Sequence, residues 1–163
     1  MGSWEVTKIR GIPLRIHPSW FLVFLYFTLS ARDQFETLLD SQTSIWNGWL
    51  IGVFTSVLLF LSVLLHELAH SFVAIGEGLK VRDITLFFLG GMANLEKECT
   101  TSKGSLKIAI SGPIVSLFLA FLMFLLSKFF FESNLIFSNL FRQVGNLNLL
   151  IGVFNLLPIM PLD

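Results

Sequence analysis

Residues 48–65 (GWLIGVFTSVLLFLSVLL) carry no charge and lead directly into His66-Glu67-Leu68-Ala69-His70. If the whole apolar stretch 45–75 is helical, it is about 45 Å long, which exceeds the roughly 30 Å hydrocarbon layer of a bilayer. An uncharged helix of this length is typical of a segment that crosses a membrane. The chain must therefore hold two histidines and a glutamate within or beside lipid.

The rest of the chain has the same apolar character. Hydrophobic residues make up 54% of the 163 residues and charged residues only 13%, whereas about a quarter of a typical soluble domain is charged. We expect an all-α polytopic membrane protein, a single core over 1–163, with about four transmembrane helices and a small β-hairpin or re-entrant element. The expected membrane segments are 18–35, 45–75, 106–131 and 140–158, the β-prone loop is 80–95, and a short edge strand is expected around Ile12, Leu14 and Ile16.

The basic residues predict an orientation. Eight of the 11 Lys and Arg residues lie near the N-terminus or in the polar loop 76–107, at positions 8, 10, 15, 80, 82, 97, 103 and 107. Cytoplasmic segments of membrane proteins carry an excess of Lys and Arg. We therefore expect the N-terminus and the 76–107 loop to face the cytoplasm. The formal net charge is zero, so no nucleic-acid partner is indicated. The long apolar stretches make a lipid bilayer the expected surroundings.

His66 and His70 are two of only three histidines in the chain. Residues four apart lie one turn apart on one helix face, so the two imidazoles can bind one zinc ion, and Glu67 beside them can accept a proton from water. The alternative is that the three polar groups satisfy one another in a helix bundle, but ionisable groups in an apolar helix are costly and usually functional. His66 lies about 14 Å before the end of the apolar helix, inside the hydrocarbon layer.

A zinc site of this kind needs a third protein ligand. Glu77 lies about 10 Å along the same helix from His70, and His17 is expected at the membrane interface. Asp163 ends an otherwise uncharged stretch, where Pro158 and Pro161 can unwind the backbone and direct the carboxylate sideways. The alternative for Asp163 is an interfacial carboxylate at a helix end. The candidates are His17, Glu77, Glu96, Glu98 and Asp163.

The two strongest motifs are His66-Glu67-Leu68-Ala69-His70 and Asn155-Leu156-Leu157-Pro158-Ile159-Met160-Pro161-Leu162-Asp163. Together they resemble the site-2 protease family of intramembrane zinc metalloproteases, peptidase family M50. Gly11-Ile12-Pro13-Leu14 and Ile16-His17-Pro18-Ser19-Trp20 resemble the start of a bacterial and archaeal branch that often carries CBS domains. Phe88-Leu89-Gly90-Gly91 resembles the glycine-bearing loop of the family, and Gly112-Pro113, which we expect to kink and pack closely, resembles its Gly-Pro helix.

The resemblance implies that His66, His70 and Asp163 bind Zn²⁺ and that Glu67 is the general base. It also implies that Asn155 lies near the substrate carbonyl or its oxyanion, the alternative being a cap on unwound backbone. A strand edge at Gly90 and Gly91 could hold an extended substrate by backbone pairing, the alternative being an ordinary tight turn.

Two features depart from the family pattern. The position three residues after Gly-Pro is often Asn in the family, and here it is Ser116. The family pattern continues with glycine and further helices, whereas the sequence ends on Asp163, so we expect a chain that is incomplete at its C-terminus and inactive by itself. The sequence assigns no role to His17, Ser116 or Cys99.

The predicted function is that of an intramembrane zinc metalloprotease, a multi-pass protein of the cell inner or plasma membrane. Its expected partners are membrane-bound regulatory proteins whose transmembrane segments it cleaves, as in regulated intramembrane proteolysis. The alternatives are a metal-handling membrane protein, which would need more intramembrane acids or histidines, and an inactive scaffold of the same fold. The sequence does not predict the substrate, the oligomeric state or the presence of a CBS domain.

Overall fold

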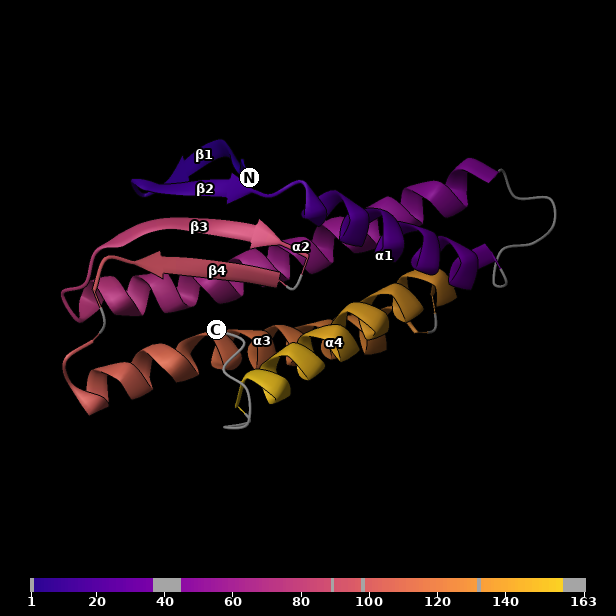
Figure 1. The fold of residues 1–163 in the computed structure, drawn as a ribbon. Coiled ribbons are helices and arrows are strands. Elements are labelled where there is room, and N and C mark those ends of the chain that lie inside the picture. The colour runs from indigo at the N-terminus through magenta and orange to yellow at the C-terminus, as the bar shows by residue number, and fades with distance from the viewer. Residues whose placement is uncertain (1, 37–44, 89, 98, 132, 157–163) are drawn as a thin grey trace.

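The computed structural model describes residues 2–36, 45–88, 90–97, 99–131 and 133–156. Within these residues the chain forms four helices and four strands (Figure 1). In chain order they are β1 (Trp4–Ile9), β2 (Ile12–Ile16), α1 (Ser19–Glu36), α2 (Ile45–Gly76), β3 (Val81–Phe87), β4 (Gly90–Leu95), α3 (Ser102–Phe130) and α4 (Leu135–Leu156). The expected mostly helical architecture is confirmed.

The β element is larger than the hairpin that the sequence predicts. The four strands form one sheet in the order β1-β2-β3-β4, in which β2 and β3 are parallel and the other neighbours are antiparallel. Arg10 and Gly11 make the tight β1–β2 turn with φ values of 48° and 86°, as a two-residue hairpin of the mirror-image type requires. Because an isolated hairpin is barely stable in water, joining the two hairpins through β2 and β3 stabilises both. The expectation of an all-α fold with one hairpin is thus corrected to helices plus a four-stranded sheet.

One face of the sheet covers the C-terminal half of α2 (Figure 1). Successive residues of a strand point to opposite faces, so Ile12 and Leu14 of β2 and Ile84 and Leu86 of β3 lie on the same side and bury Leu68 of α2. This cluster fixes the sheet over the turn of α2 that carries the histidines.

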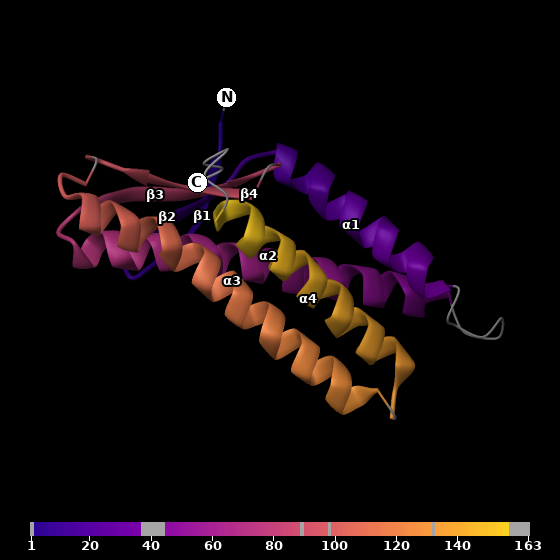
Figure 2. The ribbon, with the colours of Figure 1, turned by 90° about the horizontal axis from the view of Figure 1, so that it is seen from below.

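Helix α1 packs on the N-terminal half of α2, and α3 and α4 pack on each other and on the side of α2 away from the sheet (Figures 1 and 2). Small and polar residues allow this close packing, as is usual between membrane helices. Gly52 of α2 lies against the backbone of Thr28. The Nδ2 atom of the buried Asn148 donates a hydrogen bond of 3.1 Å to Ser62 of α2.

Two helices begin earlier than the apolar runs suggest. Helix α3 begins at Ser102 because the side chain of Thr101 accepts a hydrogen bond of 3.2 Å from the backbone N–H of Gly104. Helix α4 begins at Leu135 because the side chain of Asn134 accepts hydrogen bonds from two N–H groups of its first turn, 3.0 and 3.2 Å long. Both side chains are the helix caps that short polar residues commonly provide.

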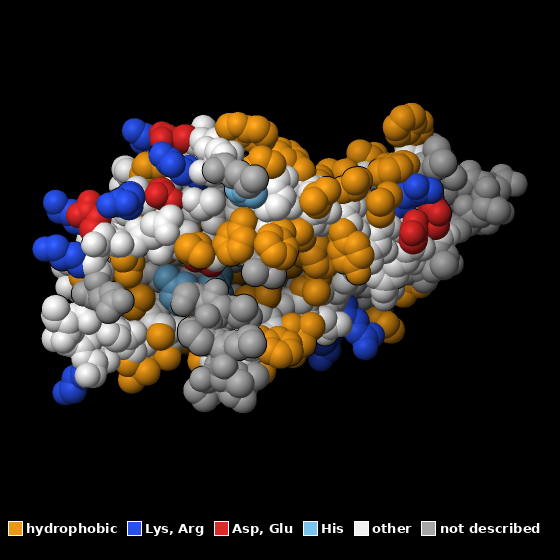
Figure 3. All heavy atoms as spheres, in the orientation of Figure 1, with side chains coloured by type: hydrophobic (Ala, Val, Ile, Leu, Met, Phe, Trp, Pro, Cys, Tyr) orange, Lys and Arg blue, Asp and Glu red, His pale blue; other side chains and the backbone are white. Residues whose placement is uncertain are grey.

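Two of the described helices are long and apolar enough to cross a membrane, Trp46–Gly76 and Ser102–Phe130, with mean hydropathies of 2.3 and 2.4. Large apolar side chains are exposed on the helices, including Phe121 at 65% and Phe129 at 79% of their full exposure. Figure 3 shows apolar side chains spread over the helical part, whereas many charged side chains gather at the end where the strands turn. A surface of this kind suits lipid around the helices and water around the sheet.

Candidate metal centre

His66, Glu67 and His70 lie in the buried middle layer of the fold, on the part of α2 between the sheet and α3. Their exposures are 2%, 4% and 6%. Burial of three ionisable groups in one turn of an apolar helix is costly unless partners hold them. The two imidazoles face α3, whereas Glu67 faces β4.

The Nε2 atoms of His66 and His70 converge, and they lie 3.1 Å apart. In a tetrahedral zinc site with Zn–N bonds of about 2.0–2.1 Å, two ligand nitrogens lie about 3.3 Å apart. The Nδ1 atom of His70 lies 2.7 Å from the carbonyl oxygen of Ile108. A carbonyl only accepts, so this bond places the proton on Nδ1 and leaves the Nε2 lone pair for a metal. The pair therefore fits a zinc ion.

Helix α3 reaches the imidazoles because position 112 has no side chain. A Cβ atom built on Gly112 would lie 2.5 Å from Nε2 of His66 and closer still to Nε2 of His70. Ser116, one turn further along α3, holds Nδ1 of His66 at 2.8 Å. Ile108, Gly112 and Ser116 thus form a stripe with a spacing of four residues, which is the signal in the sequence that could have revealed the face of α3 toward the histidines.

Positions 90 and 91 require glycine for different reasons. A Cβ atom on Gly91 would lie 2.7 Å from Cδ and 2.8 Å from Oε1 of Glu67, so only a bare backbone lets β4 pass over that carboxylate. Gly90 has open space around it but a φ of +133°, which favours glycine. The structure therefore brings Gly91 to the site, and it gives Gly90 the role of a turn residue.

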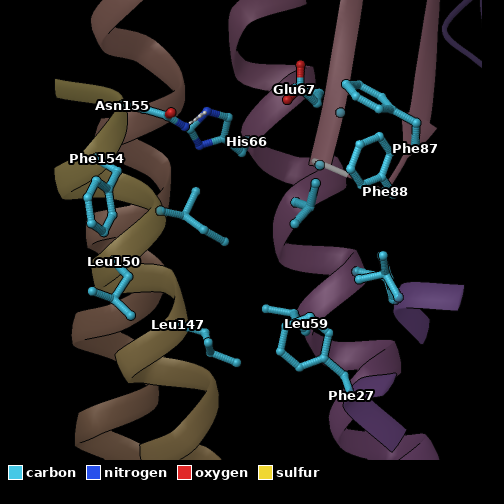
Figure 4. A pocket seen from close by; sticks show the side chains of 16 residues that line it. Phe27, Leu59, His66, Glu67, Phe87, Phe88, Leu147, Leu150, Phe154 and Asn155 are labelled. Atoms are coloured by element: carbon cyan, nitrogen blue, oxygen red, sulfur yellow. Dashed lines mark hydrogen bonds between the residues drawn. The ribbon is translucent and has the colours of Figure 1, made fainter. Parts of the chain in front are cut away.

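Asn155 extends from α4 to the imidazoles, with Nδ2 3.2 Å from Nε2 of His66 (Figure 4). Asp163, the predicted third ligand, lies outside the described residues. Within the part of the chain that the structure describes, no group of three or more His, Cys, Asp and Glu side chains could hold a metal ion. The third ligand thus remains a prediction.

The other candidate ligands lie elsewhere or outside the described residues. The imidazole of His17 is hydrogen-bonded to Ser19 at the start of α1. Glu77 forms an ion pair of 2.7 Å with Lys107. Glu96 is exposed, and Glu98 lies outside the described residues.

Two hollows meet at Glu67 and Asn155, and β4 borders both of them. The first, of about 330 Å³, is mostly apolar and is lined by α1, α2, α4 and the β3–β4 turn, including the labelled Phe27, Phe88 and Phe154 (Figure 4). The second, of about 510 Å³, lies between β4 and α3 and also contains His70 and Cys99. Hydrogen bonding to Thr101 lowers the pKa of the Cys99 thiol below its usual value.

Residues 54–138 match the family model of peptidase family M50. The chain belongs to this family, that of the site-2 proteases. The family that the motifs suggested is therefore confirmed.

Relatives agree with this assignment. This chain is 40% identical over 159 residues to sll0528 of Synechocystis, which is named as a candidate zinc metalloprotease. The match covers 98% of this chain and 41% of that protein. It is 36% identical over 161 residues to zinc metalloprotease MJ0392 of Methanocaldococcus jannaschii, covering 99% and 43%. The solved structure of the site-2 protease from M. jannaschii superimposes with a TM-score of 0.69 at 34% identity, covering 99% of this chain and 68% of that one. The chain thus has the site-2 protease fold and spans about two fifths of the length of these curated relatives.

Ser116 provides a test of the metal centre. Replacing Ser116 by alanine removes the hydroxyl that orients His66, and we expect zinc affinity to fall by about 10- to 100-fold, the usual cost of losing such a partner. The measurement is a competition titration with a chelator on the full-length protein. Ser127→Ala, which removes another buried hydroxyl from α3 far from the histidines, should bind zinc normally. Equal affinity in both variants would contradict the role of Ser116.

Proposed function

We propose that this protein is an intramembrane zinc metalloendopeptidase that cleaves membrane-spanning segments of regulatory proteins. The observation that carries the proposal is the convergence of the His66 and His70 Nε2 atoms to 3.1 Å, next to Glu67, in a buried turn of an apolar helix long enough to cross a membrane. The names of the relatives support metalloprotease activity. The proposal extends this to cleavage within the bilayer.

His66, His70 and Asp163 would hold the ion. Zinc bound there supplies Lewis-acid chemistry to water and to the scissile carbonyl. The Glu67 carboxylate accepts a proton from the attacking water and passes it to the leaving amine. Glu67 is only 4% exposed and lies under Gly91, so little bulk water competes for the proton that it holds. The Nδ2 atom of Asn155 lies beside Nε2 of His66, and with zinc on that nitrogen the Asn155 N–H would donate to the negative charge that develops on the carbonyl oxygen.

The free edge of β4 is the proposed substrate platform. Among the described strands, β4 pairs only with β3, so its outer edge is open to an additional strand. A transmembrane segment must unwind before a protease can cut it, and an unwound segment can pair with such an edge through its backbone. The register would place a peptide bond near Glu67, because Gly91 of β4 lies against that side chain. The apolar hollow between α1 and α4 fits the side chains of a membrane segment.

We further propose that all four helices lie in the membrane, with the N-terminus and the 76–107 loop on the cytoplasmic side. Helices α1 and α4 also expose large apolar side chains, such as Leu22 at 70% and Phe154 at 54%. The exposed basic residues Lys80, Arg82 and Lys103 lie at or near the sheet end. Both observations support a membrane plane that leaves the sheet in or next to the cytoplasmic headgroups.

Cleavage in lipid vesicles tests the function. The full-length protein and a substrate with one membrane-spanning segment are reconstituted together. A zinc chelator should abolish cleavage, and added zinc should restore it. Cleavage that continues in the chelator would contradict the metal mechanism. Bound zinc without cleavage would favour the inactive scaffold, and zinc flux across the vesicle membrane would favour metal handling.

A further inference from the structure

The sequence His17-Pro18-Ser19-Trp20 joins β2 to α1, next to the end of β3 (Figure 1). The metal centre uses none of these residues. Their hydrogen bonds nevertheless lead to the β3–β4 turn, from which β4 passes over Glu67.

A short chain of hydrogen bonds starts at the backbone of that turn. The N–H of Phe88 donates to Oγ of Ser19 over 3.2 Å, and Oγ of Ser19 lies 2.7 Å from Nδ1 of His17. Nδ1 also accepts the backbone N–H of Ser19 over 3.2 Å. A ring nitrogen that accepts carries no proton, so the His17 proton lies on Nε2 and the Ser19 hydroxyl donates to Nδ1. The serine oxygen then has lone pairs free for Phe88.

Residues 17–20 are also held against β3 and α2. The N–H of His17 donates to the carbonyl oxygen of Leu86 over 2.8 Å, which extends the pairing between β2 and β3. The Trp20 ring stacks on Phe24 with 5.2 Å between centroids and packs on Phe60 of α2 at 4.4 Å. Ser19 is thus a fixed point from which a hydrogen bond can hold a neighbouring turn.

The pairing of Phe87 with Gly90 closes the turn within the sheet, and the hydrogen bond from the Phe88 N–H to Ser19 attaches the turn to the start of α1. The side chain of Phe88 is 56% exposed, so its packing stabilises the turn less than a fully buried phenylalanine would. Phe88 lies three residues before Gly91, whose backbone covers the Glu67 carboxylate. A movement of the turn away from α1 would therefore shift the strand edge on which the substrate is expected to pair.

We propose that His17 and Ser19 are positioning residues: their hydrogen-bond chain to the Phe88 N–H holds the β3–β4 turn against α1 and sets the place of the β4 edge over Glu67. The effect on substrate rests on the proposed function. The effect on the turn does not, because it follows from the contacts alone. A simple helix cap is the competing role, since His17 also accepts an N–H of the first turn of α1.

Hydrogen–deuterium exchange of the full-length protein in lipid nanodiscs separates these roles. Ser19→Ala should speed exchange of the segment 86–95 by about fivefold to tenfold, the effect expected from one lost hydrogen bond on a local opening. Exchange in α1 and α4 should stay unchanged. Ser19→Thr, which keeps the hydroxyl, should restore the wild-type rate, and Ser30→Ala, at an exposed serine of α1, should have no effect.

The imidazole is tested with two matched variants. His17→Phe keeps an aromatic ring but removes the acceptor, so it should reproduce the effect of Ser19→Ala, and the double variant should add little because both changes break one chain. His17→Asn should recover much of the protection, because an asparagine oxygen readily accepts the N–H two residues later.

The values of KM and kcat then test whether the position of the turn affects substrate binding. Ser19→Ala should raise KM by about fivefold to tenfold and change kcat by less than about twofold, since it loosens the substrate platform and leaves Glu67 and the histidines in place. Unchanged exchange of 86–95 in Ser19→Ala, or faster exchange confined to α1, would overturn the proposal. Absence of cleavage by the wild-type protein would instead count against the proposed function, and the exchange data would still decide the role of Ser19.

Discussion

Replacing Glu67 by glutamine is expected to lower kcat by about 10²- to 10⁴-fold with zinc still bound, because this is the usual contribution of a general base. Glutamine has nearly the shape of glutamate and fits under Gly91, but its amide cannot accept the proton of the attacking water. His66 and His70 are untouched, so the metal should stay. The measurement combines the cleavage rate of the full-length protein with metal analysis of the same sample.

Glu77→Gln is the matched control. It makes the same chemical change just beyond α2, where the carboxylate pairs with the exposed Lys107, and surface ion pairs of this kind contribute little. This variant should cleave at the wild-type rate. If Glu67→Gln cleaved normally, Glu67 would not be the base. If the variant lost its zinc, the role of Glu67 would be structural.

Replacing Gly112 by alanine should abolish zinc binding and, with it, cleavage. The new methyl group would occupy the space in which the Nε2 atoms of His66 and His70 converge. The loss of affinity should exceed the about 10- to 100-fold that is typical of losing an outer hydrogen-bond partner. Alanine is a better helix former than glycine by about 1 kcal/mol, so α3 itself should not be weakened. Metal analysis and a thermal unfolding curve measure the two effects separately.

Gly76→Ala provides the comparison, because a Cβ atom there meets no heavy atom within 4 Å. This variant should keep its zinc and its activity. Normal zinc content in Gly112→Ala would mean that α3 moves away from the imidazoles at little cost. The close approach of α3 would then have no part in shaping the metal centre.

The sequence predicts the grouping of the three central residues because these residues are local. His66, Glu67 and His70 lie within two turns of one helix, so helical periodicity alone groups them, and the uncharged run before them predicts their burial. The partners of the imidazoles are not local. Ile108 and Ser116 belong to another helix, and their spacing identifies a shared face without identifying what that face meets.

The sheet shows the same limit. Alternating apolar residues predict strands around Ile12 and Leu14, but alternation does not identify the partner of a strand. The parallel pairing of Leu14 with Ile84 joins segments separated by two helices, and it depends on the packing of both residues on Leu68 of α2.

The early starts of α3 and α4 depend on the caps Thr101 and Asn134, which could have been predicted from residue type.

The position of the cut is the most direct test of a site within the bilayer. A vesicle-reconstituted substrate with one membrane-spanning segment is incubated with the full-length protein, and the new termini are determined by mass spectrometry. His66 lies about 14 Å from the end of the apolar part of its helix. The cut bond should therefore lie inside the membrane-spanning segment, toward its cytoplasmic half. A cut only in the sequence outside the membrane would contradict intramembrane proteolysis.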